Sequence, residues 1–555
     1  MISMTTLTDA SAAGHYYSSA MSQDIGLQIK DAGTHEVGVK DKGSVDNYYL
    51  DRQAPASWSG KGAELAGVMG KKPTKEELIN LLSGKVTHPV TGEIENLADN
   101  SKGDKRRIGY DLTFSPPKSV SVMALVGGDQ RILKAVSVAN NVGMNWIQDH
   151  AATIRVKDEQ GKNQRIDAGN LIMMQVQHET SRENDPQAHV HNVLFPHVYD
   201  AVAGKWRSLS NEDLMSIRHS ADRVVMGVLK KELERLGYDT VISKDGASWE
   251  IEGVTEEVLR EFSGRTTAID QLIKARGFDP ATASWEMRSV ATLASRDMKR
   301  EIPHAQLHAI WKERASALGI DLEALTSKSK IKAASMNTET FELAAKYKAM
   351  ESLTFAVNSL SEREQAFKVS DLEAEAVKFG KVDIRDVKEA ITIQKDKRAL
   401  VPRVITGSKE YLTTQKAITV EQDILHHITQ GIGGGIAVLT EQREFDGYLR
   451  AFEAHKGFEL TSEQRLAAKN DLMHQDFVQI TQGAAGTGKT AAKEFVRFVV
   501  ERTEGFNIIG VAPTGAAAQQ LEKESGIKSM TLAKFLNQPE HLQKHAIQDR
   551  RLAQE

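Results

Sequence analysis

The sequence predicts an α+β domain with a central antiparallel sheet, then a small helical module, then a partial P-loop α/β domain. Two observations predict this class. Two extended segments, 164–177 and 191–198, flank a polar stretch, and three histidines lie at 178, 189 and 191 where the segments meet this stretch, whereas 211–325 is mostly amphipathic helix. Near the C-terminus, a strand, a glycine-rich loop and a helix follow one another. A chain of 555 residues is long enough for roughly three domains.

Composition and charge exclude several classes of protein. No apolar run reaches the ~18 residues of a membrane helix, and the first nine residues lack the basic and apolar parts of a secretory signal. We therefore expect no membrane insertion and a cytoplasmic location. The absence of cysteine excludes disulfides and thiolate zinc sites. A net charge of −4 does not indicate a nucleic-acid partner, although basic residues cluster at 102–107 and 395–398, either as solvated surface or as a binding patch.

The N-terminal region contains two pairs of tyrosines. Residues 5–20 predict a short helix that carries Tyr16 and Tyr17. Residues 22–46 are rich in glycine and predict an inserted hairpin or loop, after which Tyr48 and Tyr49 follow. One such pair is usually half-buried packing, but two pairs near one terminus also suggest a chemical role.

Residues 109–127 predict a strand, a turn at Pro116 and Pro117, and the start of an apolar helix. Asp111 lies on this strand among apolar neighbours. Because burying a carboxylate without a partner is costly, we expect Asp111 to contact a histidine or a metal ion. A second helix is expected from about 129 to 152.

Three histidines lie at positions 178, 189 and 191. His189 and His191 alternate at strand spacing, so both rings leave the same face of the strand. The polar segment before them can fold back as a hairpin and bring His178 to the same place. Three imidazoles that converge from two strands form a divalent-metal site with open positions, which is typical of a metal that acts on a substrate.

The middle of the chain predicts mostly helices. Residues 216–236 and 256–276 are amphipathic, with a hairpin at 238–253 between them. A linker is expected at 326–350, because its start is unperiodic and rich in Ser, Lys and Thr. Residues 351–450, with a short strand ending at Thr413-Thr414 and a helix at 420–428, predict a small winged-helix-like accessory module.

Residues 451–555 contain a glycine-rich nucleotide-binding pattern. The predicted strand 477–481 leads into Gly-x-x-x-x-Gly-Lys-Thr and then a helix, and a second strand is expected at 507–512. The backbone of such a loop wraps phosphates, its lysine reaches the β and γ phosphates, and its threonine binds Mg²⁺. No downstream acidic Mg²⁺ ligand can be placed at 535–555, so we expect a truncated ATPase. The residues expected to bind ATP and Mg²⁺ are Gly483, Gly486, Thr487, Gly488, Lys489 and Thr490.

Together these features indicate phosphodiester chemistry. A metal held by neutral imidazoles would polarise a phosphate oxygen, and a tyrosine hydroxyl would attack phosphorus. Tyrosine is a weak nucleophile at neutral pH, so it needs a base or a nearby cation. Asp111 is the candidate, either as the proton acceptor or as a carboxylate that orients a ligand histidine. The metal would be Mg²⁺ or Mn²⁺, with Zn²⁺ a further possibility.

The sequence resembles the MobF conjugative relaxases of the TrwC/TraI type, which nick one DNA strand at a plasmid origin of transfer. The resemblance spans about 1–325, and 350–535 resembles the start of a superfamily-1, RecD-like helicase. It rests on the two tyrosine pairs, on the segment from Trp58 to Glu64, on Asp111-Leu-Thr-Phe-Ser-x-Pro-Lys118-Ser-Val-Ser, and on His178-Glu-Thr-Ser-Arg-x-x-Asp-Pro-x-x-His189-x-His191. The tyrosine pairs lie farther apart than is usual in this family.

The resemblance implies a palm-like sheet that grips a DNA hairpin beside the nick. It implies metal ligands at the three histidines, Asp111 as proton acceptor, Tyr16 as first nucleophile and Tyr48 or Tyr49 for a second transfer. Gln464 would match the adenine-reading glutamine of the helicase. Expected partners are single-stranded and hairpin origin DNA, relaxosome accessory proteins and a type IV secretion coupling protein, with transfer to a recipient cell.

Three functions remain open from the sequence. The chain is a DNA nicking and rejoining transesterase, or a catalytically impaired origin-binding scaffold or fragment of a longer relaxase-helicase, or a free-standing ATP-driven motor. The predicted division is relaxase at 1–325, linker at 326–350, helicase accessory module at 351–450 and partial helicase at 451–555.

Overall fold

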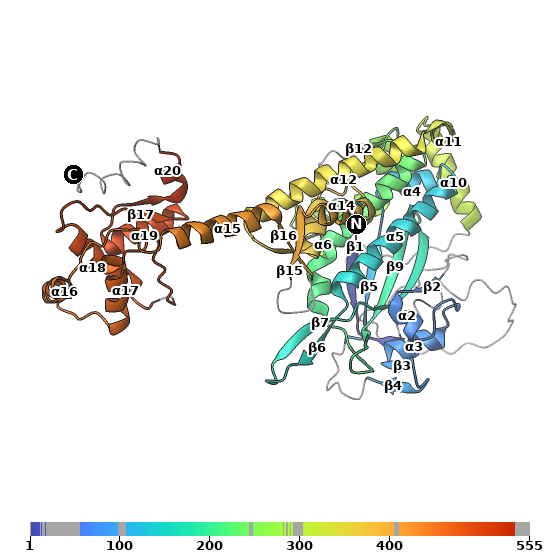
Figure 1. The fold of residues 1–555 in the computed structure, drawn as a ribbon. Helices are drawn as coiled ribbons and strands as arrows, with labels where there is room; N and C mark the ends of the chain where they lie inside the picture. The colour runs from blue at the N-terminus through green and yellow to red at the C-terminus, as the bar shows by residue number, and fades with distance from the viewer. Residues whose placement is uncertain are drawn as a thin grey trace. The chain divides into compact units, whose positions relative to one another are not determined.

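The computed structural model divides into two compact units, Met1–Gln415 and Lys416–Glu555. Each unit is described by itself (Figure 1). The structure describes residues 2–11, 13, 17, 56–97, 107–181, 183–243, 248–280, 282–284, 287, 288, 290, 291, 304–403, 410–484 and 486–538.

A five-stranded antiparallel sheet forms the centre of the first unit, in the order β1-β5-β9-β8-β2. Its long central pair is β8 and β9, which the hairpin pattern around the histidines predicts. The outer strands are far apart in sequence from the strands they contact. The bounds are β1 (Ile2–Leu7), β2 (Ala56–Ser59), β5 (Gly109–Phe114), β8 (Ile172–Thr180) and β9 (Pro186–Phe195).

The two faces of this sheet bury different cores. One face packs against α4 (Lys118–Leu125), α5 (Gln130–Ala151) and α6 (Asn211–Arg235), and it includes Leu112 and Leu194. The opposite face packs against α2 (Lys61–Leu65) and α3 (Lys75–Leu82), together with Tyr17. Alternation along a strand places the histidines of β8 and β9 on this second face.

The first strand corrects an expectation. Residues 5–7, which were expected to be helical, continue β1, where Thr5 lies opposite Asp111. β-branched Ile and Thr residues favour a strand where a partner strand is available, and β5 supplies that partner from about a hundred residues away. Of the expected helix, Ala10, Ser11, Ala13 and Tyr17 are helical, and 18–55 lies outside the described residues.

Several short antiparallel pairs surround the sheet. They are β3 (Lys85–Thr87) with β4 (Ile94–Asn96), β6 (Thr153–Lys157) with β7 (Asn163–Asp167), β10 (His197–Asp200) with β11 (Lys205–Ser208), and β12 (Thr240–Ile242) with β13 (Trp249–Ile251). The last pair is the hairpin expected at 238–253. The single strand expected at 164–177 is two strands, β7 and β8.

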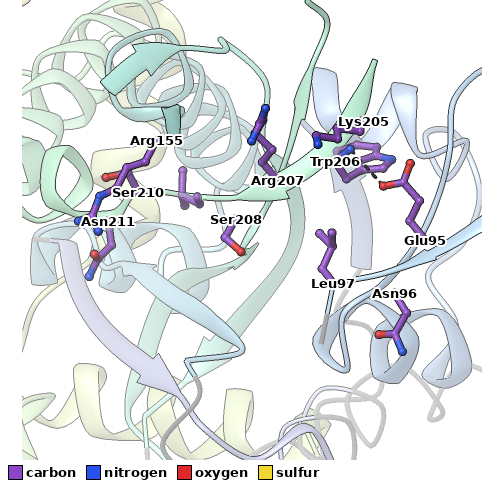
Figure 2. Close-up of a pocket in the computed structure, with 11 residues that line it drawn as sticks. Glu95, Asn96, Leu97, Arg155, Lys205, Trp206, Arg207, Ser208, Ser210 and Asn211 are labelled. Carbon is purple, nitrogen blue, oxygen red and sulfur yellow. Dashed lines mark hydrogen bonds between the residues drawn. The ribbon is translucent and has the colours of Figure 1, made fainter. Parts of the chain in front are cut away.

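A cleft of about 620 Å³ lies among β4, β6, β11 and the start of α6 (Figure 2).

Helices dominate the region after β13. The helix expected at 256–276 is two helices, α7 (Glu256–Glu261) and α8 (Gly264–Ala275), and α10 (His304–Ala317) follows. The segment expected as a linker lies in α11 (Leu322–Ser335) and α12 (Thr338–Ser361). Asp321 and Asn337 each cap the next helix with a side-chain oxygen, so this polar segment folds as helix instead of an extended connection.

Residues 367–403 and 410–414 form a small sheet with two helices, and this part belongs to the first unit. The sheet has the order β14-β16-β15 (Phe367–Lys368, Tyr411–Thr414, Leu400–Arg403), and the helices are α13 (Val369–Ala376) and α14 (Ile384–Asp396). Buried Glu373 of α13 accepts hydrogen bonds from Trp146 Nε1 at 2.7 Å and His150 Nε2 at 2.8 Å on α5. The module expected at 351–450 is therefore divided, because its part up to 415 packs on the preceding domain.

The second unit is a small α/β structure. Its helices are α15 (Gln415–Gln430), α16 (Gln442–Lys456), α17 (Ser462–Met473), α18 (Lys489–Val500), α19 (Gly515–Ser525) and α20 (Leu532–Leu536). Two short parallel strands, β17 (Gly510–Ala512) and β18 (Ser529–Thr531), pair beside them. The strand expected at 477–481 is not formed, and the side chains of Phe477 and Ile480 are exposed. A strand needs a paired strand beside it, and among the described residues the Phe477 N–H donates instead to the carbonyl oxygen of Gly431 in a turn.

In the described part of the chain, no helix is long and apolar enough to cross a membrane.

The contact between α6 and the loop before α14 generates a test of the fold. A Cβ atom added at Gly227 would lie 2.0 Å from the carbonyl oxygen of Val382. Because this oxygen belongs to the backbone, the overlap cannot be relieved by a rotamer change. We expect Gly227→Ala to destabilise the first unit by about 1–3 kcal/mol, measured as urea unfolding followed by tryptophan fluorescence.

The six tryptophans all lie between positions 58 and 311, so the fluorescence reports on the first unit alone. Gly447→Ala on α16 is the matched control, since a Cβ there meets nothing within 4 Å. It should leave the tryptophan-monitored transition unchanged. Equal transitions for both variants would show that the contact between Gly227 and Val382 is not needed.

Candidate functional site

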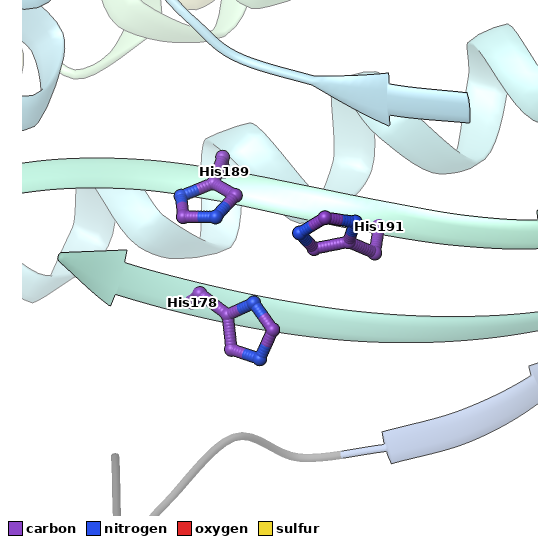
Figure 3. Close-up of side chains that lie close together, drawn as sticks. All are labelled: His178, His189 and His191. Carbon is purple, nitrogen blue, oxygen red and sulfur yellow. The ribbon is translucent and has the colours of Figure 1, made fainter. Parts of the chain in front are cut away.

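Three histidine side chains converge on one face of the β8–β9 hairpin (Figure 3). His178 lies directly opposite His189 across the hairpin, and His191 follows two residues later on the same face of β9. The ring centroids are 5.1–5.3 Å apart. One nitrogen of each ring lies within 4.8 Å of the other two. The sequence therefore predicted which histidines the fold brings together.

This set of donors fits a divalent metal ion. The three rings are buried, and each offers an imidazole nitrogen, a ligand type that suits first-row metals such as Zn²⁺, Cu²⁺ and Ni²⁺. Three protein ligands leave further coordination positions for substrate oxygens, as in catalytic metal sites and unlike closed structural sites.

Neighbouring acceptors orient two of the three rings. Nδ1 of His191 lies 2.7 Å from Oδ2 of Asp111, and Nδ1 of His189 lies 2.9 Å from the carbonyl oxygen of Gln187. When Nδ1 carries the proton and donates it to these oxygens, Nε2 of each ring has its lone pair free for a metal. Asp111, which was expected to contact a histidine or a metal, contacts His191.

The same carboxylate also holds a tyrosine. The hydroxyl of Tyr17 donates a hydrogen bond to Oδ2 of Asp111 at 3.0 Å, and the Tyr17 ring lies 6.2 Å from that of His191. Thr113, one alternation further along β5, donates to Oδ1 of Asp111 at 3.3 Å. Oδ2 of Asp111 therefore links one residue of an N-terminal tyrosine pair to a ligand histidine.

The other three candidate tyrosines, Tyr16, Tyr48 and Tyr49, lie outside the described residues.

Distant helices clamp the tip of the histidine hairpin. Buried Asp185 at the tip accepts a hydrogen bond from the backbone N–H of Gly264 at 2.8 Å and pairs with Arg314 at 3.1 Å. Trp311 Nε1 donates to the carbonyl oxygen of Asn184 at 2.8 Å. From the other side, Lys118 Nζ donates to the carbonyl oxygen of Pro186 at 3.2 Å.

The sequence analysis missed these supporting residues. Lys118 and the Asp-Pro turn belong to the motifs that carried the family resemblance, so they could have been examined. No local signal marks Arg314, which reaches the hairpin only because α10 folds back on it.

The glycine-rich loop of the second unit lies at the start of α18. Lys489 Nζ donates to the carbonyl oxygens of Gly483 at 2.6 Å and Ala484 at 2.8 Å. The Thr490 hydroxyl donates to Glu524 at 3.1 Å. Lysine and hydroxyl thus contact protein oxygens at the positions where the motif would bind phosphates and Mg²⁺.

Gln464 also contacts this loop. Its Nε2 donates to the carbonyl oxygens of Thr487 at 3.2 Å and Gly488 at 3.4 Å, while its Oε1 accepts from the backbone N–H of Thr461 at the start of α17. Gly488 has φ +73°, a backbone conformation that favours glycine, and a Cβ atom there would lie 2.2 Å from Gln464 Nε2 and displace that side chain. The described residues of the predicted nucleotide site are therefore close together.

Comparison with known families covers the region that contains this geometry. The family model for the TrwC relaxase matches residues 10–318, which is more than half of the chain and includes the histidines, Asp111 and the clamping helices. The chain belongs to the TrwC relaxase family. A second model, for an AAA domain, matches residues 459–553. The family and the C-terminal domain type that the sequence resemblance implied are thereby confirmed, as is the α+β fold class.

The chain is also similar to individual proteins. The multifunctional conjugation protein TraI of Escherichia coli is 31% identical over 357 residues, which cover 61% of this chain and 19% of that protein. TraI of Escherichia coli strain K12 is 31% identical over 361 residues, covering 63% and 19%. This relaxase-family chain therefore spans about a fifth of the length of these relatives. A metal-bound structure of the conjugative relaxase TrwC with OriT DNA is 33% identical and covers 58% of this chain and 100% of that one, with a TM-score of 0.49.

Removing the orienting carboxylate tests the metal site of this relaxase-family chain directly. We expect Asp111→Asn to lower the affinity for Mn²⁺ or Co²⁺ by about 10- to 100-fold, because a neutral amide replaces the charged acceptor that orients His191 through its Nδ1. Isothermal titration with the metal alone measures this without any nucleic acid.

His219→Ala, at an exposed position on α6, is the control and should bind metal normally. His189→Ala should bind metal still more weakly than Asp111→Asn. If His189→Ala bound metal as well as the wild type, the histidine set would not be the metal site.

The environment of Lys118 generates a pH prediction. Burial lowers its pKa from 10.5 to about 8, against the opposing charges of Asp185 and Glu250. The unfolded chain therefore binds more protons than the folded chain between pH 8 and 10.5, so stability rises with pH in this window. We expect the unfolding free energy of wild type minus that of Lys118→Met to be flat below pH 8 and to increase above it, in urea titrations.

Lys330→Met, at an exposed position on α11, is the control. The unfolding free energy of wild type minus that of Lys330→Met should not increase above pH 8. A difference that stays flat through pH 10 for Lys118→Met would contradict the lowered pKa.

Proposed function

We propose that this chain nicks and rejoins one strand of DNA at a plasmid origin of transfer. The observation that carries the proposal is the buried group formed by three histidines, Asp111 and Tyr17, within the region that matches the relaxase family. TraI is described as a conjugation protein, and TrwC as a relaxase in complex with OriT DNA. The same substrate class is proposed for this chain.

His178, His189 and His191 would hold a divalent ion, Mg²⁺ or Mn²⁺ in the first instance. When bound, the ion polarises an oxygen of the scissile phosphodiester and offsets the charge that develops in the transition state. Asp111 keeps the ring of His191 fixed through its 2.7 Å contact. The histidines and Asp111 thus form a preorganised site, so little reorganisation is needed during reaction.

A tyrosine hydroxyl then carries out the transfer. Tyr16 is the proposed nucleophile. Its oxygen bonds to phosphorus and its proton passes to Asp111. The bond between phosphorus and the 3′ oxygen of the upstream nucleotide breaks, and this oxygen takes up a proton from water or from Asp111 and leaves as a free hydroxyl. The product is a 5′-phosphotyrosine that retains the phosphodiester energy. In the reverse step a 3′ hydroxyl attacks this linkage and restores the tyrosine.

Tyr17 has a supporting role in this scheme. Its hydroxyl already donates to Asp111, so it holds the carboxylate and anchors the segment that carries its neighbour. Tyr48 or Tyr49 would provide the second transfer, as the family resemblance implies.

The second unit would bind ATP with Mg²⁺. Gln464, Lys489 and Thr490 occupy the positions that the family motifs require, within the region that matches the AAA domain. Strand unwinding by this unit, interaction with relaxosome accessory proteins and a secretion coupling protein, and passage into a recipient cell belong to the same proposal.

Adjacent tyrosines provide a matched test of the nucleophile. We expect Tyr16→Phe to abolish the covalent adduct between the full chain and an oligonucleotide that carries the cognate nick site. Tyr17→Phe should retain the adduct at a reduced rate, of the order of 10-fold, because only a hydrogen bond to Asp111 is lost. Adducts are resolved by denaturing gel and mass spectrometry in Mn²⁺.

The opposite pattern would assign the attack to Tyr17. Binding of origin DNA without any adduct in the metal-loaded wild type would favour the scaffold alternative and contradict the proposed nicking activity.

A further inference from the structure

Two buried serines near the start of α4 contact different strands. Oγ of Ser121 accepts a hydrogen bond from the backbone N–H of Ala188 on β9 at 3.1 Å. Oγ of Ser119 accepts one from the backbone N–H of Ile251 on β13 at 2.8 Å. Both serines are almost fully buried. α4 is therefore bonded to the strand that carries two of the ligand histidines and, separately, to a hairpin that carries none.

The contact with Ala188 lies just beyond the point where β9 loses a neighbouring strand. The pairing of β5 with β9 ends at Phe114 and Val190. The two prolines of the turn before α4 follow, and proline has no N–H with which to extend the ladder. Because a buried backbone N–H needs an acceptor, the hydroxyl of Ser121 supplies one for Ala188.

The same peptide group contacts a ligand histidine at its other end. The N–H of Ala188 and the carbonyl oxygen of Gln187 belong to one peptide bond, and this oxygen lies 2.9 Å from Nδ1 of His189. A peptide bond is planar, and this one is trans, since the described residues contain no cis bond. Fixing the direction of its N–H therefore also fixes its carbonyl oxygen. Through this group, Ser121 controls the acceptor that orients the His189 ring.

Lys118 holds the preceding peptide group. Its Nζ donates to the carbonyl oxygen of Pro186 at 3.2 Å, and that carbonyl belongs to the peptide bond before the one that Ser121 holds. Two successive peptide groups of β9 are therefore bound to α4 immediately before His189. A rotation of the second group would break its contact with Ser121 and turn its oxygen away from Nδ1 of His189.

A change in the direction of this ring would affect metal binding. The contact at Nδ1 leaves Nε2 of His189 available as a ligand atom only while the ring keeps its orientation. In the described part of the chain, the metal-binding group consists of His189 together with His178 and His191 (Figure 3). Displacement of one ring in three therefore weakens the site.

We propose that Ser121 and Lys118 are positioning residues of the metal site, which fix the peptide group whose carbonyl oxygen orients His189. The inference rests on the metal site of the proposed function and does not depend on cleavage. Ser119 has no such role, because its partner lies on β13. α4 would thus support one ligand ring as Asp111 supports another.

Metal titration of the full chain tests the proposal with two matched variants. Ser121→Ala and Ser119→Ala each remove one buried hydroxyl that accepts a backbone N–H, so both should lower the urea midpoint of tryptophan fluorescence by similar amounts. Only Ser121→Ala should lower the affinity for Mn²⁺, by about 10-fold, in isothermal titration without nucleic acid. Ser119→Ala should bind Mn²⁺ as the wild type does.

Bound Co²⁺ provides a readout that a loss of stability alone would not change. The visible absorption of this ion depends on the arrangement of its ligands. In the metal-saturated chain, the spectrum of Ser121→Ala should differ from that of the wild type in band position or intensity. The spectrum of Ser119→Ala should coincide with that of the wild type.

Lys118→Met provides the test if Ser121→Ala does not fold. It releases the neighbouring peptide group and should lower the Mn²⁺ affinity as well. Wild-type affinity in Lys118→Met, or in a folded Ser121→Ala, would overturn the proposal. Equal losses of affinity in Ser121→Ala and Ser119→Ala would also overturn it, because α4 would then support only the fold as a whole.

The wild type separates this inference from the proposed function. A wild type that binds no Mn²⁺ would contradict the metal site and the inference together. A wild type that binds Mn²⁺ with the expected difference between the two serine variants, but forms no tyrosine adduct with DNA, would contradict only the nicking activity.

Discussion

The antiparallel register of β8 and β9 is the constraint on which the histidine site depends. His178 faces His189 across this pair, and the two-residue repeat of the strand places His191 on the same side. A shift of one residue in β9 would turn His189 and His191 toward the helices α4, α5 and α6. The apolar residues of β9 on the other face, Val190 and Leu194, oppose such a shift because they are buried in that core.

Asp111 joins the tyrosine segment to the histidine site. Its Oδ2 is shared between the Tyr17 hydroxyl and Nδ1 of His191. Because both donors use one oxygen, the position of the N-terminal segment and the orientation of a ligand ring are linked. β1 precedes this segment and pairs with β5 at Thr5 and Asp111, so the sheet also carries the tyrosine to its partner.

Local patterns predicted the parts of the fold that local interactions determine. The sequence predicts the alternation of His189 and His191, the polar turn before them and the helix at 130–151, because strands repeat every two residues and helices every 3.6. The sequence does not show which distant strands pair. Residues 5–7 of β1 were expected to be helical, because their partner strand lies far away at 109–114. The strand expected at 477–481 did not form, because a strand depends on its neighbours. Likewise, nothing near Tyr17 in sequence shows that it contacts Asp111.

The clamp on the hairpin tip determines how short a working relaxase fragment can be. Asp185 is buried at the tip of the histidine hairpin. Among the described residues its only guanidinium partner is Arg314, which lies on α10, outside the sheet. A fragment that ended after α8 would contain every proposed ligand and yet lose the guanidinium that pairs with this buried carboxylate, which is destabilising. The minimal unit is therefore set by electrostatics at the back of the hairpin, more than a hundred residues beyond the last ligand, and not by the extent of the sheet.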